Sequence, residues 1–211
     1  MPSKIKIKFL IACVFLMVVA VCATEGRAIS IKDLFSTLSY VVSGTWFLLF
    51  LWDRWLWSLP ILDLLSKRPD LRGTWKGALQ SDYPDPTTKE KRGPIDVYLV
   101  IRQTNSTIDV RLFSAESSSV SLSGNLIADN GGVTMLTITY RNEPRLFNRE
   151  RSQMSYGGML LHVRGNEVYQ LDGEYWTDRL TRGEAKFATR SKTVCHDFGQ
   201  ASQMTNQVLK A

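Results

Sequence analysis

Two long hydrophobic runs precede a region in which hydrophobic and polar positions alternate. The second run, Leu34 to Trp52, contains no charged residue. A helix of its 19 residues spans about 29 Å, close to the thickness of a hydrocarbon core. We therefore expect a transmembrane helix over residues 34–52. A buried core helix is the alternative, but it would need a larger domain than the remaining residues can build.

The first run, Phe9 to Ala23, has two interpretations. It covers only about 22 Å as a helix, and its flanks also fit a cleavable signal peptide. We favour a retained helix over about residues 7–25. Both interpretations leave the following domain in the cytoplasm. Basic residues precede the first run and follow the second, and the positive-inside rule places such residues on the cytoplasmic side: Lys4, Lys6, Lys8, Arg54, Lys67, Arg68 and Arg72. The sequence predicts a multi-pass protein of the bacterial inner membrane with both termini in the cytoplasm.

From Leu71 onward the hydrophobic period is two, which is typical of half-buried strands. The clearest hairpin joins strands at 95–102 and 108–112 through a turn at 103–106. Six further strands are expected at 73–81, 118–127, 132–141, 157–164, 167–176 and 182–190. Consecutive antiparallel strands can remove their exposed edges by closing into a small barrel, and a sandwich is the alternative. We assign 1–66 to a membrane region, 70–190 to an all-β barrel of about eight strands, and 191–211 to a polar tail.

The alternation also predicts which side chains fill the barrel. The expected interior residues are Trp75, Leu79, Ile95, Val97, Leu99, Ile101, Val110, Leu112, Leu136, Ile138, Tyr140, Leu161, Val163, Leu171, Tyr175 and Phe187. These side chains are enough to fill an eight-stranded interior, so we expect little room for a central ligand.

The net charge of +6 is unevenly distributed along the chain. Residues 1–69 carry eight Lys/Arg against four Asp/Glu, whereas residues 70–190 carry 16 against 15. The excess is therefore mostly a membrane-topology signal, and we expect no DNA or RNA partner. Twelve of the 16 cations in 70–190 are arginine, which suits phosphate or carboxylate, although paired surface arginines are a simpler explanation.

The sequence offers little support for an enzyme. It has no nucleophile elbow, zinc-binding His-Glu-x-x-His, paired Cys-x-x-Cys or phosphate-binding glycine loop. Cys195-His196-Asp197 contains the residue types of a catalytic triad, but adjacent side chains diverge and the trio lies in the polar tail. We expect no enzymatic activity, no metal and no cofactor other than an activating ligand.

Two polar and aromatic blocks, 139–145 and 172–183, lie at predicted strand ends. Arginine suits phosphate, aromatic faces suit base stacking, and Asn or Thr suits base edges, so the blocks match a small nucleotide. Turns with local salt bridges are the structural alternative.

The order of several segments resembles the CD-NTase-associated protein 15 family, the two-transmembrane, β-strand-rich effectors of the bacterial antiphage systems called CBASS. The segments are 71–77 (LRGTWKG), 97–104 (VYLVIRQT), 110–113 (VRLF), 139–145 (TYRNEPR), 173–179 (GEYWTDR) and 181–183 (TRG). The resemblance implies a cytosolic barrel that binds a cyclic dinucleotide made by a companion nucleotidyltransferase, the CD-NTase. Binding would drive homo-oligomerisation and disrupt the inner membrane lipids, causing abortive infection.

Chemistry alone suggests the ligand residues. If residues 102 and 107 pair across the hairpin turn, Tyr98 lies opposite Arg111, and Arg102 shares their polar face. Together with the two blocks this gives nine candidates: Tyr98, Arg102, Arg111, Tyr140, Arg141, Asn142, Trp176, Thr177 and Arg179. The sequence leaves open which cyclic dinucleotide binds.

The alternative function is a membrane-tethered, lipocalin-like barrel for a lipid or other apolar ligand. Gly73-Thr74-Trp75 is similar to the start of a lipocalin barrel. A small-residue stripe, Ser36, Ser39, Ser43 and Gly44, would let the second hydrophobic helix approach another closely, as assembly in a membrane requires.

Overall fold

The structure is a computed structural model. It describes residues 31–59, 68–82, 93–128, 132–150, 152–165 and 167–208. The chain divides into two compact units, Met1–Arg68 and Pro69–Ala211.

The first unit contains helix α2 (Ile31–Arg54), followed by a short 3-10 helix, η1 (Leu56–Ser58). Helix α2 includes the whole second hydrophobic run. Among the residues that the structure describes, no helix has both the length and the apolar character needed to cross a membrane. The first predicted helix, 7–25, lies outside the described residues.

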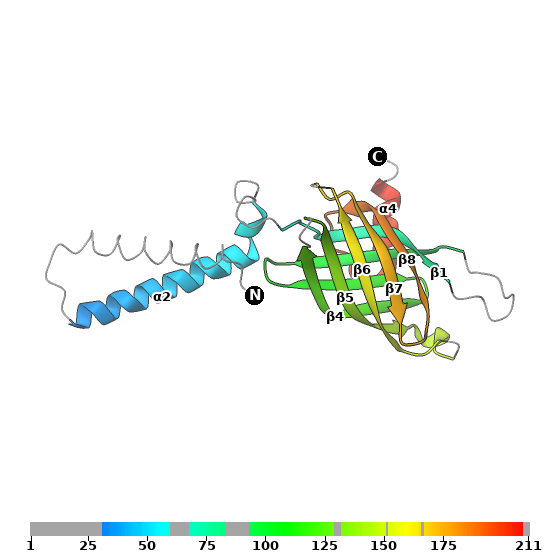
Figure 1. The fold of residues 1–211 in the computed structure, drawn as a ribbon, viewed down its shortest axis with the longest axis horizontal. Coiled ribbons are helices and arrows are strands. Elements are labelled where there is room, and N and C mark those ends of the chain that lie inside the picture. The colour runs from blue at the N-terminus through cyan, green and yellow to red at the C-terminus, as the bar shows by residue number, and fades with distance from the viewer. Residues whose placement is uncertain are drawn as a thin grey trace. The chain divides into compact units, whose positions relative to one another are not determined.

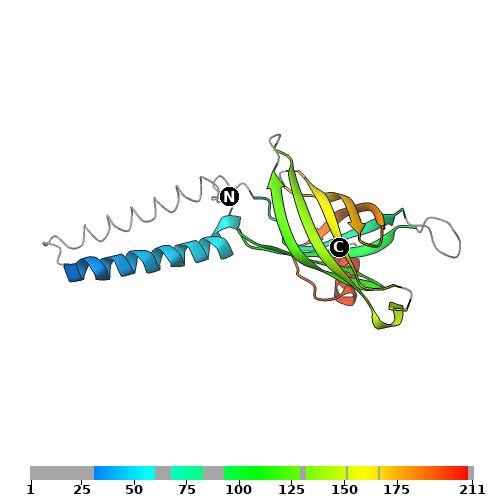
Figure 2. The same cartoon turned by 60° about the horizontal axis from the view of Figure 1, so that its bottom comes forward.

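The second unit is a closed barrel of eight strands, each antiparallel to the next (Figures 1 and 2). The strands are β1 (Gly73–Ser81), β2 (Ile95–Gln103), β3 (Ile108–Ser114), β4 (Ser117–Ala128), β5 (Thr134–Pro144), β6 (Ser155–Arg164), β7 (Gln170–Thr177) and β8 (Arg182–Ser191). Strand β1 pairs with both β2 and β8, which closes the barrel. The predicted barrel and its eight strands are confirmed, and the sandwich is excluded.

The interior of the barrel is a packed hydrophobic core. Of the predicted interior residues, twelve are buried, and Leu79, Leu112 and Val163 pack partly buried against them. The side chains of Leu99, Ile101 and Phe187 have 1% exposure or less. Ile95 faces inward as expected but is 36% exposed, because it starts β2 and lines the cavity at the open end of the barrel.

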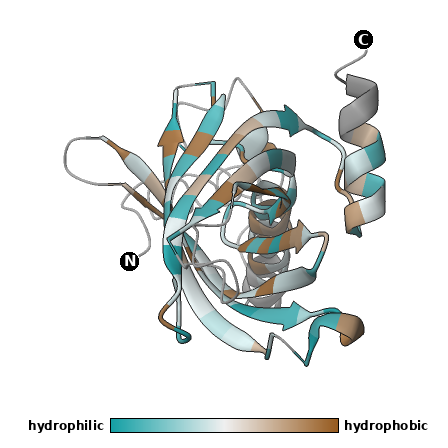
Figure 3. Cartoon of the chain, turned by 90° about the vertical axis from the view of Figure 1, so that its right-hand side faces the viewer, coloured by the Kyte–Doolittle hydropathy of each residue, from teal (hydrophilic) through white to brown (hydrophobic). Residues whose placement is uncertain are grey.

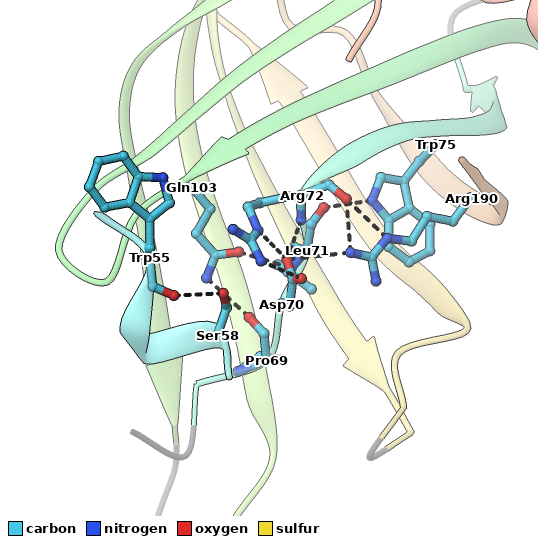
Figure 4. A network of polar contacts seen from close by, with 9 residues as sticks. All are labelled: Trp55, Ser58, Pro69, Asp70, Leu71, Arg72, Trp75, Gln103 and Arg190. Atoms are coloured by element: carbon cyan, nitrogen blue, oxygen red, sulfur yellow. Dashed lines mark hydrogen bonds and ion pairs between the residues drawn. The ribbon is translucent and has the colours of Figure 1, made fainter. Parts of the chain in front are cut away.

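A polar network seals the end of the barrel at which β1 begins (Figure 4). The Leu71 N–H donates to Oε1 of Gln103 at 2.9 Å, and Nε2 of Gln103 donates to the Pro69 carbonyl at 3.0 Å. The Trp75 indole N–H donates to the Leu71 carbonyl at 2.9 Å, and the Arg190 guanidinium lies over the Trp75 ring. The network thus supplies hydrogen-bond partners to the backbone of residues 69–71, just before β1 begins.

Asp70 belongs to the same network. Its carboxylate accepts two hydrogen bonds from the Arg72 guanidinium and lies 3.4 Å from Arg190. Burial alone would raise the pKa of Asp70, but the hydrogen bonds from Arg72 outweigh it and the pKa is lowered. Asp70 therefore stays ionised.

The C-terminal segment is not an unstructured polar tail, because helix α4 (Phe198–Val208) lies on the outside of the barrel wall (Figure 3). It covers an outer cluster of buried residues that includes Tyr98, Val100 and Phe113. The Asp197 carboxylate caps the helix by accepting the Gln200 N–H at 2.9 Å. The sequence analysis missed this helix.

The predicted register of the β2–β3 hairpin was wrong by two residues. Arg102 pairs with Asp109, not with residue 107, and Arg111 lies opposite Val100. The turn comprises residues 104–107, closed by a hydrogen bond from the Thr104 N–H to the Thr107 carbonyl at 3.0 Å. Tyr98 therefore faces Phe113 across the strands.

We expect Gln103→Ala to lower the free energy of unfolding by about 1 to 3 kcal/mol, because it leaves the buried Leu71 N–H and Pro69 carbonyl without their partner. Urea unfolding of residues 69–211 measures this. The matched control is Gln153→Ala, since Gln153 is exposed, and it should change stability by less than about 0.5 kcal/mol. Equal effects of the two substitutions would contradict the role given to the network.

A second prediction concerns Asp172, whose pKa is lowered to about 2, chiefly by hydrogen bonds from Arg164. A lowered pKa stabilises the fold above the unfolded-state value of about 4 and loses that contribution as the pH falls toward 2. Asp172→Asn should therefore cost up to about 1 kcal/mol at pH 7 and nothing near pH 2.

The measurement is urea unfolding at several pH values, with Asp109→Asn as control, since Asp109 is exposed and forms no ion pair with a described residue. A deficit in Asp172→Asn that stays constant down to pH 2 would show that the ion pair is not its source.

Candidate functional site

The barrel is open at the end opposite the sealing network. A cavity of about 390 Å³ lies there, lined by residues from β1 to β7, including the β3–β4 turn. Its volume falls in the range of about 300 to 1,000 Å³ typical of small-molecule sites. Deeper in the barrel, a void lined by Leu99, Ile138 and Met159 measures only about 10 Å³. The expectation of a packed interior thus holds for the middle of the barrel, whereas the mouth is hollow.

Two tyrosines line the cavity, Tyr140 of β5 and Tyr175 of β7, with strand β6 between their strands. Both are buried, with 8% and 7% exposure. Burial raises the pKa of Tyr140, so its phenol stays protonated and can donate a hydrogen bond. Their rings give the mouth aromatic surface of the kind that stacks on planar ligands.

Polar side chains from β4, β5 and β6 also line the cavity. Ser119 donates to Oδ1 of Asn142 at 3.0 Å, which orients the amide so that its NH₂ group remains available. Among the described residues, neither that NH₂ group, nor the Tyr140 hydroxyl, nor the hydroxyl of buried Ser155 has a hydrogen-bond partner. These three groups open into one cavity, where each can form a hydrogen bond with a ligand.

Two glycines of β6 make this geometry possible. A Cβ on Gly157 would lie 2.6 Å from the Tyr140 hydroxyl oxygen, and one on Gly158 would lie 2.5 Å from the Trp176 indole. Gly157 thus leaves room for the phenol inside the barrel, and Gly158 lets the indole lie against the strand. The Gly-Gly pair within a strand pattern is a signal of close approach that the sequence analysis did not use.

The loops at the mouth carry arginines that form no ion pair with a described residue: Arg145, Arg149 and Arg179. Nη1 of Arg179 donates to Ser152 Oγ at 2.9 Å, which links the β7–β8 and β5–β6 loops. By contrast, Arg141 pairs with Glu143 and Arg182 with Asp82. The unpaired cations are available to an anionic ligand.

The nine candidate residues fall into four places. Tyr140, Asn142 and Thr177 line the cavity, and Arg141 and Arg179 lie on the wall and loop beside it. Trp176 is half exposed and lines a second hollow, described below. Tyr98, Arg102 and Arg111 lie on the outer face of β2 and β3. There Tyr98 was wrongly expected on a solvated face, because it is 4% exposed and its ring packs edge-on against Phe198 at 5.4 Å.

A second hollow, of about 510 Å³, lies where β7 and β8 meet the end of β1. Its charged lining is Asp82, Glu174, Glu184 and Arg182, and the arginine is already bound to Asp82 at 2.7 Å. Because Asp82 and Arg182 neutralise each other, the carboxylates of Glu174 and Glu184 leave the hollow negatively charged, which would repel phosphate, so this hollow does not suit a nucleotide.

The described residues contain no cluster of metal-ligating side chains. Cys195 is buried and donates its backbone N–H to Thr74, His196 contacts Arg102, and Asp197 caps α4. These three residues are therefore used structurally and do not form a nucleophile and base pair.

Comparison with known proteins agrees with the geometry. The family model described as "Cap15, cyclic dinucleotide receptor domain" matches residues 66–189. CD-NTase-associated protein 15 of Staphylococcus schleiferi is 27% identical over 149 residues, covering 71% of this chain and 76% of that relative. The resemblance expected from the sequence is confirmed. The matched segment includes strands β1 to β7 entirely and most of β8, so the chain belongs to the Cap15 family of cyclic dinucleotide receptor domains.

Proposed function

We propose that this chain is a CBASS effector whose barrel mouth binds the cyclic dinucleotide made by a companion CD-NTase. The observation that carries the proposal is the cavity lined by Tyr140 and Tyr175, with three open hydrogen-bonding groups at its wall. A nucleobase needs an aromatic surface and a few polar groups at its edge, and this cavity offers both.

The phosphates bind outside the cavity in this proposal. The described residues that line the cavity include no cation, whereas Arg145, Arg149 and Arg179 lie on the adjoining loops and form no ion pair with a described residue. Arg102 and Arg111 also lack such partners, but they have no open aromatic face beside them, because Phe198 packs against Tyr98. The mouth is therefore favoured over the outer face of β2 and β3.

A lipid ligand fits less well. An acyl chain needs a long apolar tunnel, and below the mouth the barrel is filled by its core. An enzymatic role finds no support either, since the described residues bring no nucleophile and base together.

In this proposal the membrane region, residues 1–66, carries out the response to the bound ligand. We propose that it anchors the chain in the inner membrane, with both termini in the cytoplasm, and that ligand-driven oligomerisation disrupts the bilayer. The uncharged run 34–52, within helix α2, supports the anchor, and its small residues permit close helix packing.

Exposed apolar side chains on the mouth loops support assembly through the barrel as well. Phe147 is 96% exposed and Leu180 is 92% exposed. Leu180 has a positive φ of 58°, a conformation that is costly for a leucine. Its backbone is nevertheless held by a hydrogen bond from its N–H to the Thr177 carbonyl at 3.1 Å. Exposed apolar side chains on ordered loops can contact another protein surface. We propose that Phe147 and Leu180 contact a second copy of the chain.

The binding proposal predicts that Arg179→Ala and Asn142→Ala weaken binding of the activating cyclic dinucleotide. Loss of the charged donor should reduce affinity by roughly 10- to 150-fold, and loss of the amide by roughly 3- to 10-fold. Titration calorimetry of residues 69–211 with a panel of cyclic dinucleotides measures both. The controls are Arg111→Ala and Asn125→Ala, which remove the same groups elsewhere on the barrel.

A thermal melt of each variant confirms folding. If Arg111→Ala weakens binding while Arg179→Ala does not, the ligand binds the outer face of β2 and β3 instead of the mouth. If no member of the panel binds the parent protein, the receptor proposal fails.

The assembly proposal predicts that Phe147→Asp combined with Leu180→Asp abolishes the ligand-dependent increase in particle size, because a carboxylate cannot be buried unpaired at the interface. Sedimentation of the full chain in detergent micelles, with and without ligand, measures this. Affinity for the ligand should change less than about threefold, since neither side chain lines the cavity. Leu122→Asp, an exposed site on β4, serves as control. Persistent assembly in the double variant would place the interface elsewhere.

A further inference from the structure

We infer that the loop carrying Phe147 in one chain docks into the acidic hollow on the outside of the barrel of a second chain. The inference rests on the assembly proposed above, and it names the surface that receives the loop. Residues 145–149 are called the docking loop below. The hollow formed where β7 and β8 meet the end of β1 is called the outer hollow.

The outer hollow contains two carboxylates that repel each other. Glu174 of β7 lies directly opposite Glu184 of β8 in the strand register, and like charges at such a pair destabilise a sheet. Both side chains are exposed, and neither forms an ion pair with a described residue. The neighbouring pair on the same face joins Asp172 with Lys186, which have opposite charges. The two glutamates therefore suit a cationic partner.

The outer hollow also has an aromatic wall. Trp176 is 52% exposed, and one face of its indole lies against β6, where a Cβ on Gly158 would be 2.5 Å from the ring. The hollow measures about 510 Å³, which is large enough to receive an aromatic side chain. A partner that combines cations with an apolar ring would match both the charge and the aromatic wall.

The docking loop has this combination. It contains the 3-10 helix η3 (Leu146–Asn148), with Arg145 before it and Arg149 after it. The Arg145 N–H donates to the Glu116 carbonyl at 2.9 Å, which fixes the start of the loop. Phe147 is 96% exposed, so the loop does not occupy the hollow of its own chain, and both surfaces are open to a second chain. An arginine has five N–H donors, so one that contacts a phosphate can still donate to a carboxylate.

Tyr175 connects the outer hollow with the ligand cavity. It lines both, and it is the one residue that the two linings share among the described residues. A ligand in the mouth cavity can therefore contact a side chain that also forms part of the docking surface. This shared side chain gives ligand binding a physical connection to docking.

The test mixes two variants of the full chain in detergent micelles, each lacking one of the two surfaces. The loop variant is Phe147→Asp, and the hollow variant combines Glu174→Lys with Glu184→Lys. The probe is whichever cyclic dinucleotide of adenine, guanine or uracil nucleotides, alone or mixed, binds the parent chain most tightly. With this ligand, neither variant alone should increase in size during sedimentation. An equimolar mixture should show roughly a doubling or more of the protein mass per particle, since each variant supplies the surface that the other lacks.

The matched control combines Asp109→Lys with Glu167→Lys, which makes the same change in net charge at exposed sites away from the hollow and should assemble like the parent chain. Both test variants should bind the ligand within about threefold of the parent affinity, because none of the substituted residues lines the mouth cavity. A thermal melt checks folding. If charge reversal lowers the melting temperature, Glu174→Gln with Glu184→Gln takes its place, because it removes the repulsion.

Assembly of the hollow variant alone to the parent size, or a mixture that stays at the size of its components, would overturn the inference and leave ligand binding intact. A parent chain that binds ligand without assembling would remove the assembly proposal and the inference together. Absence of binding by every member of the panel would remove the receptor proposal as well.

Discussion

Closure of the sheet is the constraint on which the rest of this domain depends. Because β1 pairs with β8, each strand has two neighbours and successive side chains must alternate between a sealed interior and the outer surface. The chain enters at the end sealed by Gln103 and Trp75, which leaves the opposite end as the place where polar groups can line a hollow. The cavity is thus a consequence of where the apolar side chains stop.

Along β5 this transition takes only a few residues. Leu136 and Ile138 are core side chains, Tyr140 presents a ring with a polar tip, and Asn142 is fully polar. All four share the inner face, so one strand carries the change from core to site. On β6, Gly157 gives the Tyr140 phenol its space. The rigidity of the core is therefore passed directly to the groups that we propose contact the ligand.

Alternation was sufficient to predict the strands, the closed barrel and most of its core, because the burial of one face fixes the period of two. The register of the β2–β3 hairpin and the structure of the C-terminal segment could not be predicted from alternation. The β2–β3 turn could begin at either Gln103 or Thr104 with the same alternation, so a shift of two residues kept every side chain on its face while changing the partners of Tyr98 and Arg111. Helix α4 is polar and short, although Asp197 and Gln200 have the spacing of a capping box.

Residue chemistry selected several side chains that lie at or beside the mouth, but it did not distinguish their environments. Arg141 and Arg179 are alike in sequence, yet the first is held by Glu143 and the second has no carboxylate partner among the described residues. An arginine already paired at a surface offers little to a phosphate, since the ligand must first displace its partner. In the function that we propose, the loop arginines contact the phosphates and the aromatic cavity contacts a base, so the charged and planar parts of the ligand bind at separate places.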